Sequence, residues 1–212
     1  MDEASQMVFR KLWPAEAGHL EDHLLRLGRD DRLLRFGRPV ADETIRAYCA
    51  GTDWMRSIVL GGFVGGTMRA AGEIKLLDGR WPQRAEIAIT VEAPFQDRGV
   101  GTRILRRLIV IARNRFVGRI YMICMADNRR MQRIARKFGT ILVFSDSQVE
   151  GRIIPPFPDV WSLFGEAAEE TLALAHGALA HGALARTASP KVTRMGNSGL
   201  DADAAPAPTG GG

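Results

Sequence analysis

Cysteine is scarce in this sequence, and long apolar runs are missing from it. The two cysteines, Cys49 and Cys124, lie far apart, which excludes a disulfide framework and is typical of a reducing compartment. No apolar run reaches the roughly 20 residues of a membrane-spanning helix. The first residues, MDEASQMVFRKLW, lack the basic and apolar regions of a signal peptide. We therefore predict a cytoplasmic protein that does not enter a membrane.

Lysine and histidine are also few. Only four of the 29 basic residues are lysine, and the net charge is +5. This charge favours acidic partners such as phosphorylated cofactors, although a genome that encodes arginine in place of lysine would give the same composition. No basic block with interleaved aromatic residues and no helix-turn-helix spacing occurs, so nucleic acid is not an expected partner. His176 and His181 have no further ligand types nearby, so we expect no metal.

The length of 212 residues suits one domain with appendages. We predict a globular domain over residues 1–165, an alanine-rich helix over residues 166–186 and a disordered tail over residues 187–212. The tail is rich in Pro, Gly and Ala and has little apolar surface to bury. The oligomeric state stays open, and a homodimer is one option.

Apolar spacing and turn residues predict the order of elements. A strand comes first, followed by three helices, three antiparallel strands, a helix, a strand, a helix and two strands. Their expected ranges are 6–13, 15–28, 30–37, 40–51, 57–66, 68–79, 85–92, 102–116, 118–126, 127–139 and, for the last two strands, 140–157. In the strand 85–92, Ile87, Ile89 and Val91 face one side, and Glu86, Ala88 and Thr90 face the other.

The stretch FQDRGVGTRIL, residues 95–105, joins an alternating strand to a helix. The first N–H groups of a helix have no partners within it, and the helix dipole is positive there, so an anion is favoured. Gly99 and Gly101 remove side chains that would keep a diphosphate from the backbone. A glycine turn without a ligand is the alternative, since the stretch matches neither a P-loop nor the GxGxxG pattern.

Two motifs in this order resemble the GNAT superfamily of acyl-CoA-dependent N-acetyltransferases. The family's phosphate loop, (Gln/Arg)-x-x-Gly-x-(Gly/Ala), is matched by Gln96, Asp97, Arg98, Gly99, Val100 and Gly101. Its second signature is matched by Asn128, Met131, Ile134, Lys137 and Gly139. The resemblance covers residues 6–157 and implies an α+β fold. In that fold a central, mostly antiparallel mixed sheet is splayed between its fourth and fifth strands and flanked by helices.

The resemblance also implies roles for individual residues. Backbone amides from Arg98 to Thr102 would hold the pyrophosphate of acetyl-CoA, the acyl donor. Main-chain groups of Thr90 and Val91 would bind the pantetheine arm and polarise the acetyl carbonyl. Asn128 would contact the cofactor near its thiol end, although a plain helix N-cap explains this residue equally well.

An amine acceptor must lose a proton before it attacks a thioester, and a carboxylate is the usual base. Glu86 resembles the general base of the family's lysine acetyltransferases, while Glu92 is the reserve candidate and Glu73 a distant third. About 13 Å separate Glu86 from Thr90 at the usual strand rise, so proton transfer would pass through water. A structural salt bridge is the alternative role for Glu86.

One position departs from the family pattern, because Ala135 stands where many members carry a tyrosine that protonates the leaving thiolate. Met131 with Ala135, and the stretch DRLLRFG, resemble the bacterial protein-lysine acetyltransferase branch. Cys124 is expected in the core. His19 and His23, four residues apart on the first helix, could line an acceptor site, but we expect them to be exposed.

The resemblance therefore implies an enzyme that moves an acetyl group from acetyl-CoA to a primary amine by direct attack in a ternary complex. The acceptor amine is a protein lysine or a small molecule. Two alternatives stay open: an acyl-CoA sensor of the same fold without catalysis, which Ala135 would suit, and a toxin-like acetyltransferase of aminoacyl-tRNA, which only the basic charge suggests.

Overall fold

A seven-stranded mixed sheet forms the centre of the protein in the computed structural model, which describes residues 3–77, 79, 81–157, 165, 166, 168 and 171. The strand order is β1-β2-β3-β4-β5-β7-β6, and every neighbouring pair is antiparallel except β4 and β5. The strands are β1 Val8–Lys11, β2 Ser57–Val64, β3 Thr67–Leu76, β4 Gln83–Val91, β5 Val117–Met125, β6 Ile141–Ser145 and β7 Gln148–Ile153. The predicted α+β fold and its mostly antiparallel sheet are confirmed.

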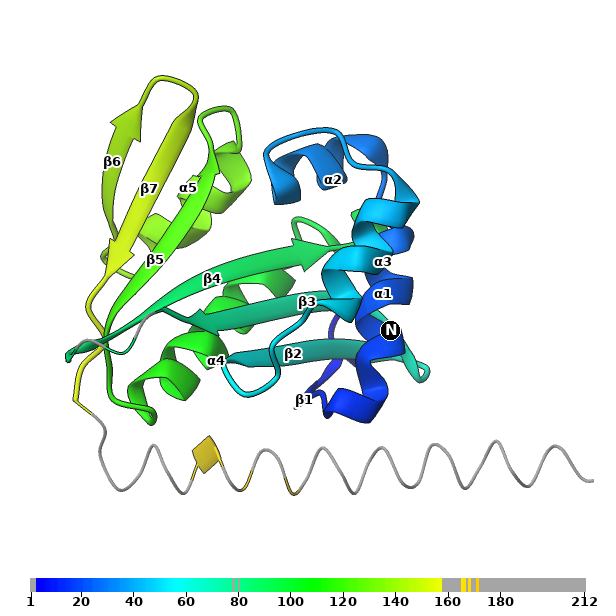
Figure 1. The fold of residues 1–212 in the computed structure, drawn as a ribbon, viewed down its shortest axis with the longest axis horizontal. Helices are drawn as coiled ribbons and strands as arrows, with labels where there is room; N and C mark the ends of the chain where they lie inside the picture. Colours follow the sequence, from blue (N-terminus) through cyan, green and yellow to red (C-terminus); the bar gives the residue numbers. More distant parts are fainter. Residues whose placement is uncertain are drawn as a thin grey trace, which may run out of the picture.

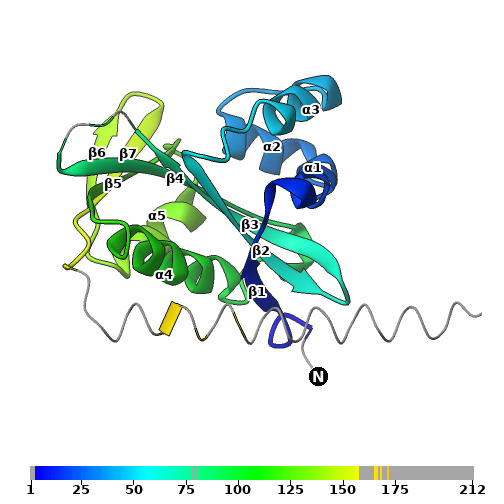
Figure 2. The ribbon, with the colours of Figure 1, turned by 60° about the horizontal axis from the view of Figure 1, so that its bottom comes forward.

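Helices cover both faces of this sheet, as Figures 1 and 2 show. The helices α1, α2 and α3 follow β1 and lie on one side, whereas α4 lies on the other. The α-helices are α1 Ala17–Leu25, α2 Arg29–Phe36, α3 Asp42–Ala50, α4 Val100–Arg113 and α5 Arg129–Arg136, and short 3-10 turns occur at Pro14–Glu16 and Ala93–Phe95. The predicted helices are thus present, with ends that differ by a few residues.

The apolar stripe of α4 builds the larger core. Ile104, Leu105 and Leu108 are completely buried, and they pack with Ile74 of β3 and Ile87 of β4. Their spacing of three and four residues puts them on one helical face. Alternation on β4 is also confirmed, because Ile87 belongs to this core and Ile89 and Val91 pack against it. The other face of β4 is therefore directed at α1–α3.

Between β4 and β5 the sheet opens. These two parallel strands are paired from Gln83 with Val117 up to Ile87 with Met122. From there β4 continues to Val91 beside β3, and β5 continues to Met125 beside β7. Figure 1 shows the two strands diverging toward their carboxyl ends. The expected splay between the fourth and fifth strands is confirmed.

The predicted C-terminal helix over 166–186 and the tail over 187–212 lie outside the described residues, apart from positions 166, 168 and 171. Glu166 makes polar contacts with the domain: its carboxylate lies 2.5 Å from Lys11 Nζ and 3.0 Å from Arg115 Nη1, and it accepts a hydrogen bond of 2.6 Å from Asn114 Nδ2. Glu166 is therefore attached to β1 and to the residues that end and follow α4.

At Gly72 on β3, α4 packs closely against the sheet. A Cβ atom at Gly72 would lie 2.4 Å from Ile104 Cγ2 and 3.0 Å from Leu108 Cδ1. We predict that Gly72→Ala lowers the free energy of unfolding by about 1–3 kcal/mol, because an overpacked core must shift. Urea unfolding checks this value. Gly18→Ala is the matched control, since a Cβ there meets nothing within 4 Å, and equal losses in both variants would contradict the packing explanation.

Candidate active site

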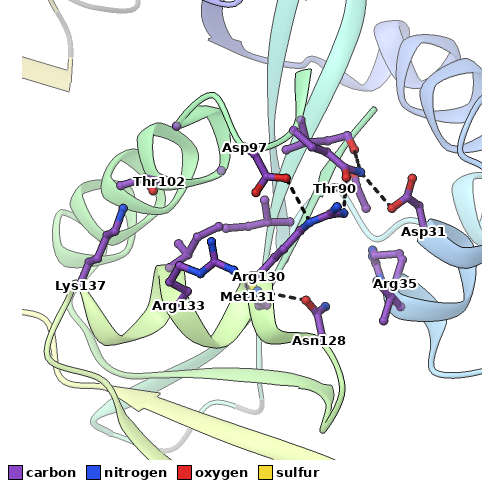
Figure 3. Close-up of a pocket in the computed structure, with 17 residues that line it drawn as sticks. Asp31, Arg35, Thr90, Asp97, Thr102, Asn128, Arg130, Met131, Arg133 and Lys137 are labelled. Carbon is purple, nitrogen blue, oxygen red and sulfur yellow. Dashed lines mark hydrogen bonds and ion pairs between the residues drawn. The ribbon is translucent and has the colours of Figure 1, made fainter. Parts of the chain in front are cut away.

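A groove opens where β4 and β5 part. It is lined by three residues of α2, the end of β4, the loop after it, the start of α4 and one face of α5 (Figure 3). Seven of the sequence-predicted site residues lie together here: Thr90, Val91, Gln96, Gly99, Gly101, Thr102 and Asn128. Segments far apart in the sequence therefore meet at one site.

The N-terminus of α4 supplies hydrogen-bond donors to this groove. Gly99 is the N-cap and has a left-handed backbone with φ of 77°, a conformation that a glycine adopts without strain. The first backbone bond of the helix runs from Arg103 N to Gly99 O at 3.0 Å. The amides of Val100, Gly101 and Thr102 precede that bond, so they are available to an anion at the positive end of the helix dipole.

Gly101 also allows α5 to pack against the start of α4. A Cβ atom at this position would lie 2.8 Å from Ile134 Cδ1. The two other predicted loop residues point elsewhere: Val100 is buried in the core, and Arg98 is exposed and outside the groove lining. If Val100 contacts a ligand, its backbone must do so, because its side chain is buried.

Gln96 ties the loop to three other elements. Its side-chain amide donates to Val91 O at 2.9 Å and to Asp31 Oδ1 of α2 at 2.9 Å. Its Oε1 accepts a hydrogen bond from Arg130 of α5, and Arg130 Nε also lies 3.4 Å from Asp97 Oδ2. The glutamine of the loop motif thus acts as a structural connection between β4, α2 and α5.

Cations outnumber acids along the groove. The lining contains four basic side chains, Arg35, Arg130, Arg133 and Lys137, and two acidic ones, Asp31 and Asp97. Three of the basic residues share one face of α5, because their spacing is three and four positions. A long groove with this charge suits a ligand that carries several negative charges.

Asn128 begins α5 and lines the groove. Its Oδ1 accepts a hydrogen bond of 3.0 Å from Met131 N, which makes it the N-cap of the helix. The cap is therefore confirmed, and its side-chain amide group is still able to donate to a ligand.

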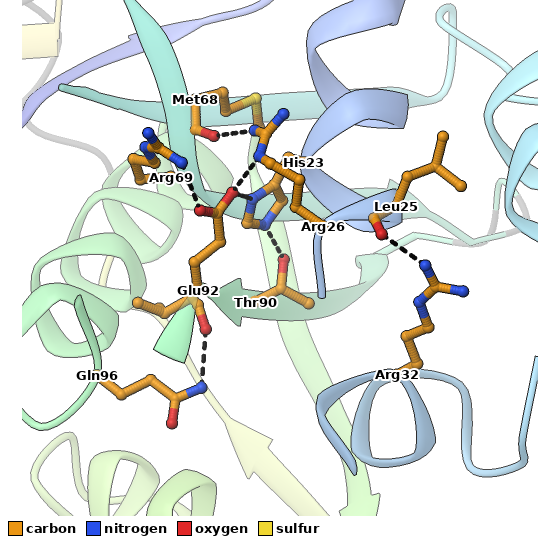
Figure 4. Close-up of polar contacts among 10 residues, drawn as sticks. His23, Leu25, Arg26, Arg32, Met68, Arg69, Thr90, Glu92 and Gln96 are labelled. Carbon is orange, nitrogen blue, oxygen red and sulfur yellow. Dashed lines mark hydrogen bonds and ion pairs between the residues drawn. The ribbon is translucent and has the colours of Figure 1, made fainter. Parts of the chain in front are cut away.

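The side chain of Thr90 belongs to a buried polar cluster behind the groove (Figure 4). Thr90 Oγ1 lies 2.8 Å from His23 Nε2, and His23 Nδ1 lies 3.2 Å from Glu92 Oε1. Glu92 also accepts hydrogen bonds of 2.9 Å from Arg26 Nε and from Arg69 Nη1. This cluster joins α1, β3 and the end of β4.

Our expectation that His23 is exposed was wrong, because its side chain is completely buried. Leu20, Leu24 and Leu27 form the buried stripe of the first helical segment, and residue 23 falls on that stripe. A histidine can be buried there because both of its ring nitrogens have hydrogen-bond partners.

Glu92, the reserve candidate for the base, lies in this cluster and not in the groove lining. Burial acts to raise the pKa of Glu92, but hydrogen bonds from His23, Arg69 and Arg26 outweigh it and hold the pKa at about 2. A carboxylate with such a low pKa is a weak proton acceptor at neutral pH. Its charge is available to orient His23.

Glu86 stays a prediction as the base. It is half-buried on β4, where its neighbours in register are Lys75 of β3 and Tyr121 of β5, and it is not among the residues that line the groove. Glu73, the third candidate, lies 2.7 Å from Arg35 Nη2 and accepts a hydrogen bond of 2.5 Å from the Tyr48 hydroxyl.

The leaving thiolate has no tyrosine in the family's usual place. Ala135 is completely buried. Tyr48 is engaged with Glu73, and burial together with that carboxylate raises the pKa of Tyr48. Cys124 is buried as predicted, and burial raises the pKa of its thiol.

Sequence reasoning missed the contribution of α2 and of His23. Asp31, Leu34 and Arg35 line the groove from α2, although no spacing in that helix indicates a ligand. His23 could have been found, because its spacing from Leu20 and Leu27 places it on the buried side of α1.

Among the described residues, no group of three or more His, Cys, Asp or Glu side chains is arranged to hold a metal ion. In the same part of the chain, no helix is long and apolar enough to cross a membrane.

The family model of the acetyltransferase (GNAT) domain matches residues 7–141. The chain therefore belongs to the GNAT acetyltransferase family, whose members use acyl-CoA. A comparison with curated protein sequences found no match.

Solved structures support the same fold. The GNAT domain of S. lividans PAT is 20% identical with a TM-score of 0.60, and the match covers 69% of this chain and 89% of that one. The ribosomal-protein-S18-alanine N-acetyltransferase of Escherichia coli is 14% identical with a TM-score of 0.55, covering 73% and 97%. RimL, a ribosomal L7/L12 α-N-protein acetyltransferase in complex with coenzyme A, is 16% identical with a TM-score of 0.54, covering 69% and 92%.

The low pKa of Glu92 leads to a prediction about acid stability. A carboxyl group whose folded-state pKa is lowered stabilises the fold above its ordinary pKa, and this stabilisation is lost as the pH falls through the folded value. For Glu92 that window extends from 4.5 down to about 2. We expect the loss of unfolding free energy in Glu92→Gln to be largest at neutral pH and to shrink as the pH falls below 4.5.

Urea unfolding of wild type and variant between pH 7 and pH 3 checks this prediction. Glu43→Gln is the control, because the Glu43 side chain is 83% exposed and such substitutions change stability little. A Glu92→Gln deficit that stays constant over the whole pH range would contradict the ionised state assigned to Glu92.

Proposed function

We propose that this protein is an N-acetyltransferase that moves an acetyl group from acetyl-CoA to a primary amine by direct attack in a ternary complex. The observation that carries the proposal is the groove itself, in which the N-terminus of α4, the open edge of β4 and the basic face of α5 converge. Acetyl-CoA would supply the activated acetyl thioester. The residues of the chain have to bind it, orient it and remove a proton from the acceptor.

The donor-binding roles follow from the groups available. Amides from Arg98 to Thr102 would hold the pyrophosphate, which is the anion that a helix N-terminus favours. Main-chain groups of Thr90 and Val91 stand at the edge where β4 has left β5, so they would hydrogen-bond the pantetheine arm and polarise the acetyl carbonyl. The side-chain amide of Asn128 would assist near the thiol end.

The acceptor is a protein lysine or a small-molecule amine. The similarity of the fold to the GNAT domain of S. lividans PAT, together with Met131 and Ala135, supports a protein lysine. We also propose a cytoplasmic location, which the two free cysteines support.

Release of free CoA from acetyl-CoA tests this function, with panels of small amines, lysine-containing peptides and charged tRNA as acceptors. We expect turnover with an amine or a peptide. Tight acetyl-CoA binding without turnover of any acceptor would favour the sensor of the same fold, for which the buried Ala135 is the specific observation. Turnover only of charged tRNA would favour the toxin-like activity.

Charge reversal on α5 tests the position of the donor. We predict that Arg133→Glu weakens acetyl-CoA binding by about tenfold, equivalent to about 1.4 kcal/mol, because Arg133 lines the groove. The effect should shrink at high salt, since counterions screen exposed charges. Isothermal titration with acetyl-CoA measures the affinities of wild type and variant at low and at high salt.

Arg136→Glu is the matched control, because Arg136 is exposed on the same helix but lies outside the groove lining. We expect it to change acetyl-CoA affinity little. Equal weakening by both substitutions would show a general charge effect and would contradict a donor site along the face that carries Arg133.

A further inference from the structure

A chain of hydrogen-bonding side chains runs from the interior to the groove, and the donor-binding roles above do not use these side chains. It begins at Glu92, passes through both ring nitrogens of His23 and ends at the hydroxyl of Thr90, with distances of 3.2 Å and 2.8 Å (Figure 4). His23 is completely buried, whereas Thr90 lines the groove. Thr90 is thus the member of this chain of groups that lines the groove.

The protonation states follow from the partners. Arg26 and Arg69 bind the Glu92 carboxylate, and an ionised carboxylate can only accept hydrogen bonds. His23 Nδ1 therefore donates to Glu92, and in the tautomer that carries its proton on Nδ1 alone, Nε2 accepts a hydrogen bond. The Thr90 hydroxyl then donates to Nε2, and its oxygen lone pairs are left to accept a hydrogen bond from the groove side.

We propose that Thr90 and His23 form a proton relay that deprotonates the acceptor amine, with Glu92 as the residue that positions His23. This role rests on the proposed acetyl transfer. An N–H bond of the ammonium breaks and its proton binds Thr90 Oγ1, while the original hydroxyl proton moves to His23 Nε2. The nitrogen keeps the electron pair with which it attacks the thioester, and His23 later returns the proton to the solvent through Thr90.

Glu92 is the charged group that contacts the His23 ring directly, at 3.2 Å from Nδ1. Thr90, on β4, and Glu92, just after it, contact the His23 ring directly. Arg26, at the end of α1, and Arg69, on β3, bind the Glu92 carboxylate. The Glu92 side chain is 8% exposed and touches the ring, whereas Arg26 and Arg69 are 36% and 34% exposed.

Thr90 and Glu86 also differ in their distance from the groove. Both Glu86 and Thr90 lie on the face of β4 that is directed at α1–α3, but only Thr90 lines the groove. The strand rise places these residues about 13 Å apart. A base has to be within hydrogen-bond reach of the proton that it removes, directly or through one water.

The test compares two acceptors, an alkylamine from the panel and hydroxylamine, whose nitrogen is already unprotonated at neutral pH. We expect Thr90→Val and His23→Gln to lower kcat with the alkylamine by about 10²–10⁴-fold, with acetyl-CoA affinity nearly unchanged. Thr90→Ser keeps the hydroxyl and should keep most of the activity. With hydroxylamine the decrease in kcat of Thr90→Val and His23→Gln should be much smaller. With the alkylamine the difference in kcat between these variants and wild type should become smaller as the pH rises.

Several results would overturn the relay. Equal losses with both acceptors would mean a structural role for Thr90 and His23. Wild-type rates in Thr90→Val and His23→Gln, combined with a full loss in Glu86→Gln, would assign proton removal to Glu86. If wild-type protein binds acetyl-CoA but turns over neither acceptor, the proposed acetyl transfer itself fails.

A measurement without turnover tests the same chain of groups. Nitrogen-15 NMR of wild-type protein at neutral pH should show His23 protonated at Nδ1 and unprotonated at Nε2, and Thr90→Val should shift the Nε2 resonance. A proton on Nε2 with a bare Nδ1 would contradict the relay, whatever the activity. Melting temperatures of the variants identify any that fail to fold.

Discussion

The parting of β4 and β5 beyond Ile87 and Met122 is the constraint on which the rest of the site depends. Backbone groups that lose a strand partner need another one, and the edge of β4 from Ala88 to Val91 therefore has groups to offer a ligand. Each of the two strands is followed by a helix, so the N-termini of α4 and α5 both arrive at the gap. Parallel pairing of these strands is what brings the two helix ends together.

The two sides of β4 at this gap have different properties. Toward α4 the side chains are apolar and pack into the larger core, which holds the strand and the loop in place. Toward α1–α3 they are polar, and Thr90 and Glu92 are buried among His23, Arg26 and Arg69. Backbone donors on one side and the proposed relay on the other would suit the proposed transfer of an acetyl group to an amine.

Much of this arrangement could be predicted from local sequence. The alternation of β4, the glycines of the loop and the Asn128 cap act over a few residues, and the structure has each of them where the sequence indicates. Helical spacing could likewise predict that the basic residues of α5 that line the groove share one face of the helix. The bounds of α4 differ by two or three residues, because helix ends depend on capping by Gly99 and on packing.

The rest depends on contacts between distant segments. Asp31 meets Gln96 across 65 positions, and His23 meets Thr90 across 67. No periodicity in α2 indicates that Arg35 would reach the groove. The low pKa of Glu92 likewise follows from hydrogen bonds from His23, Arg69 and Arg26 on other elements. Its sequence position just after the strand therefore could not distinguish a base from an ion-pair partner.

Hydrogen exchange of single backbone amides, followed by NMR with and without saturating CoA, tests most directly whether the groove is the donor site. We expect exchange of the Val100, Gly101 and Thr102 amides to slow when CoA is added, because these donors precede the first hydrogen bond of α4. Amides on the far strand β1 should not change. CoA binding that leaves the three α4 amides unaffected would contradict the assignment of the groove.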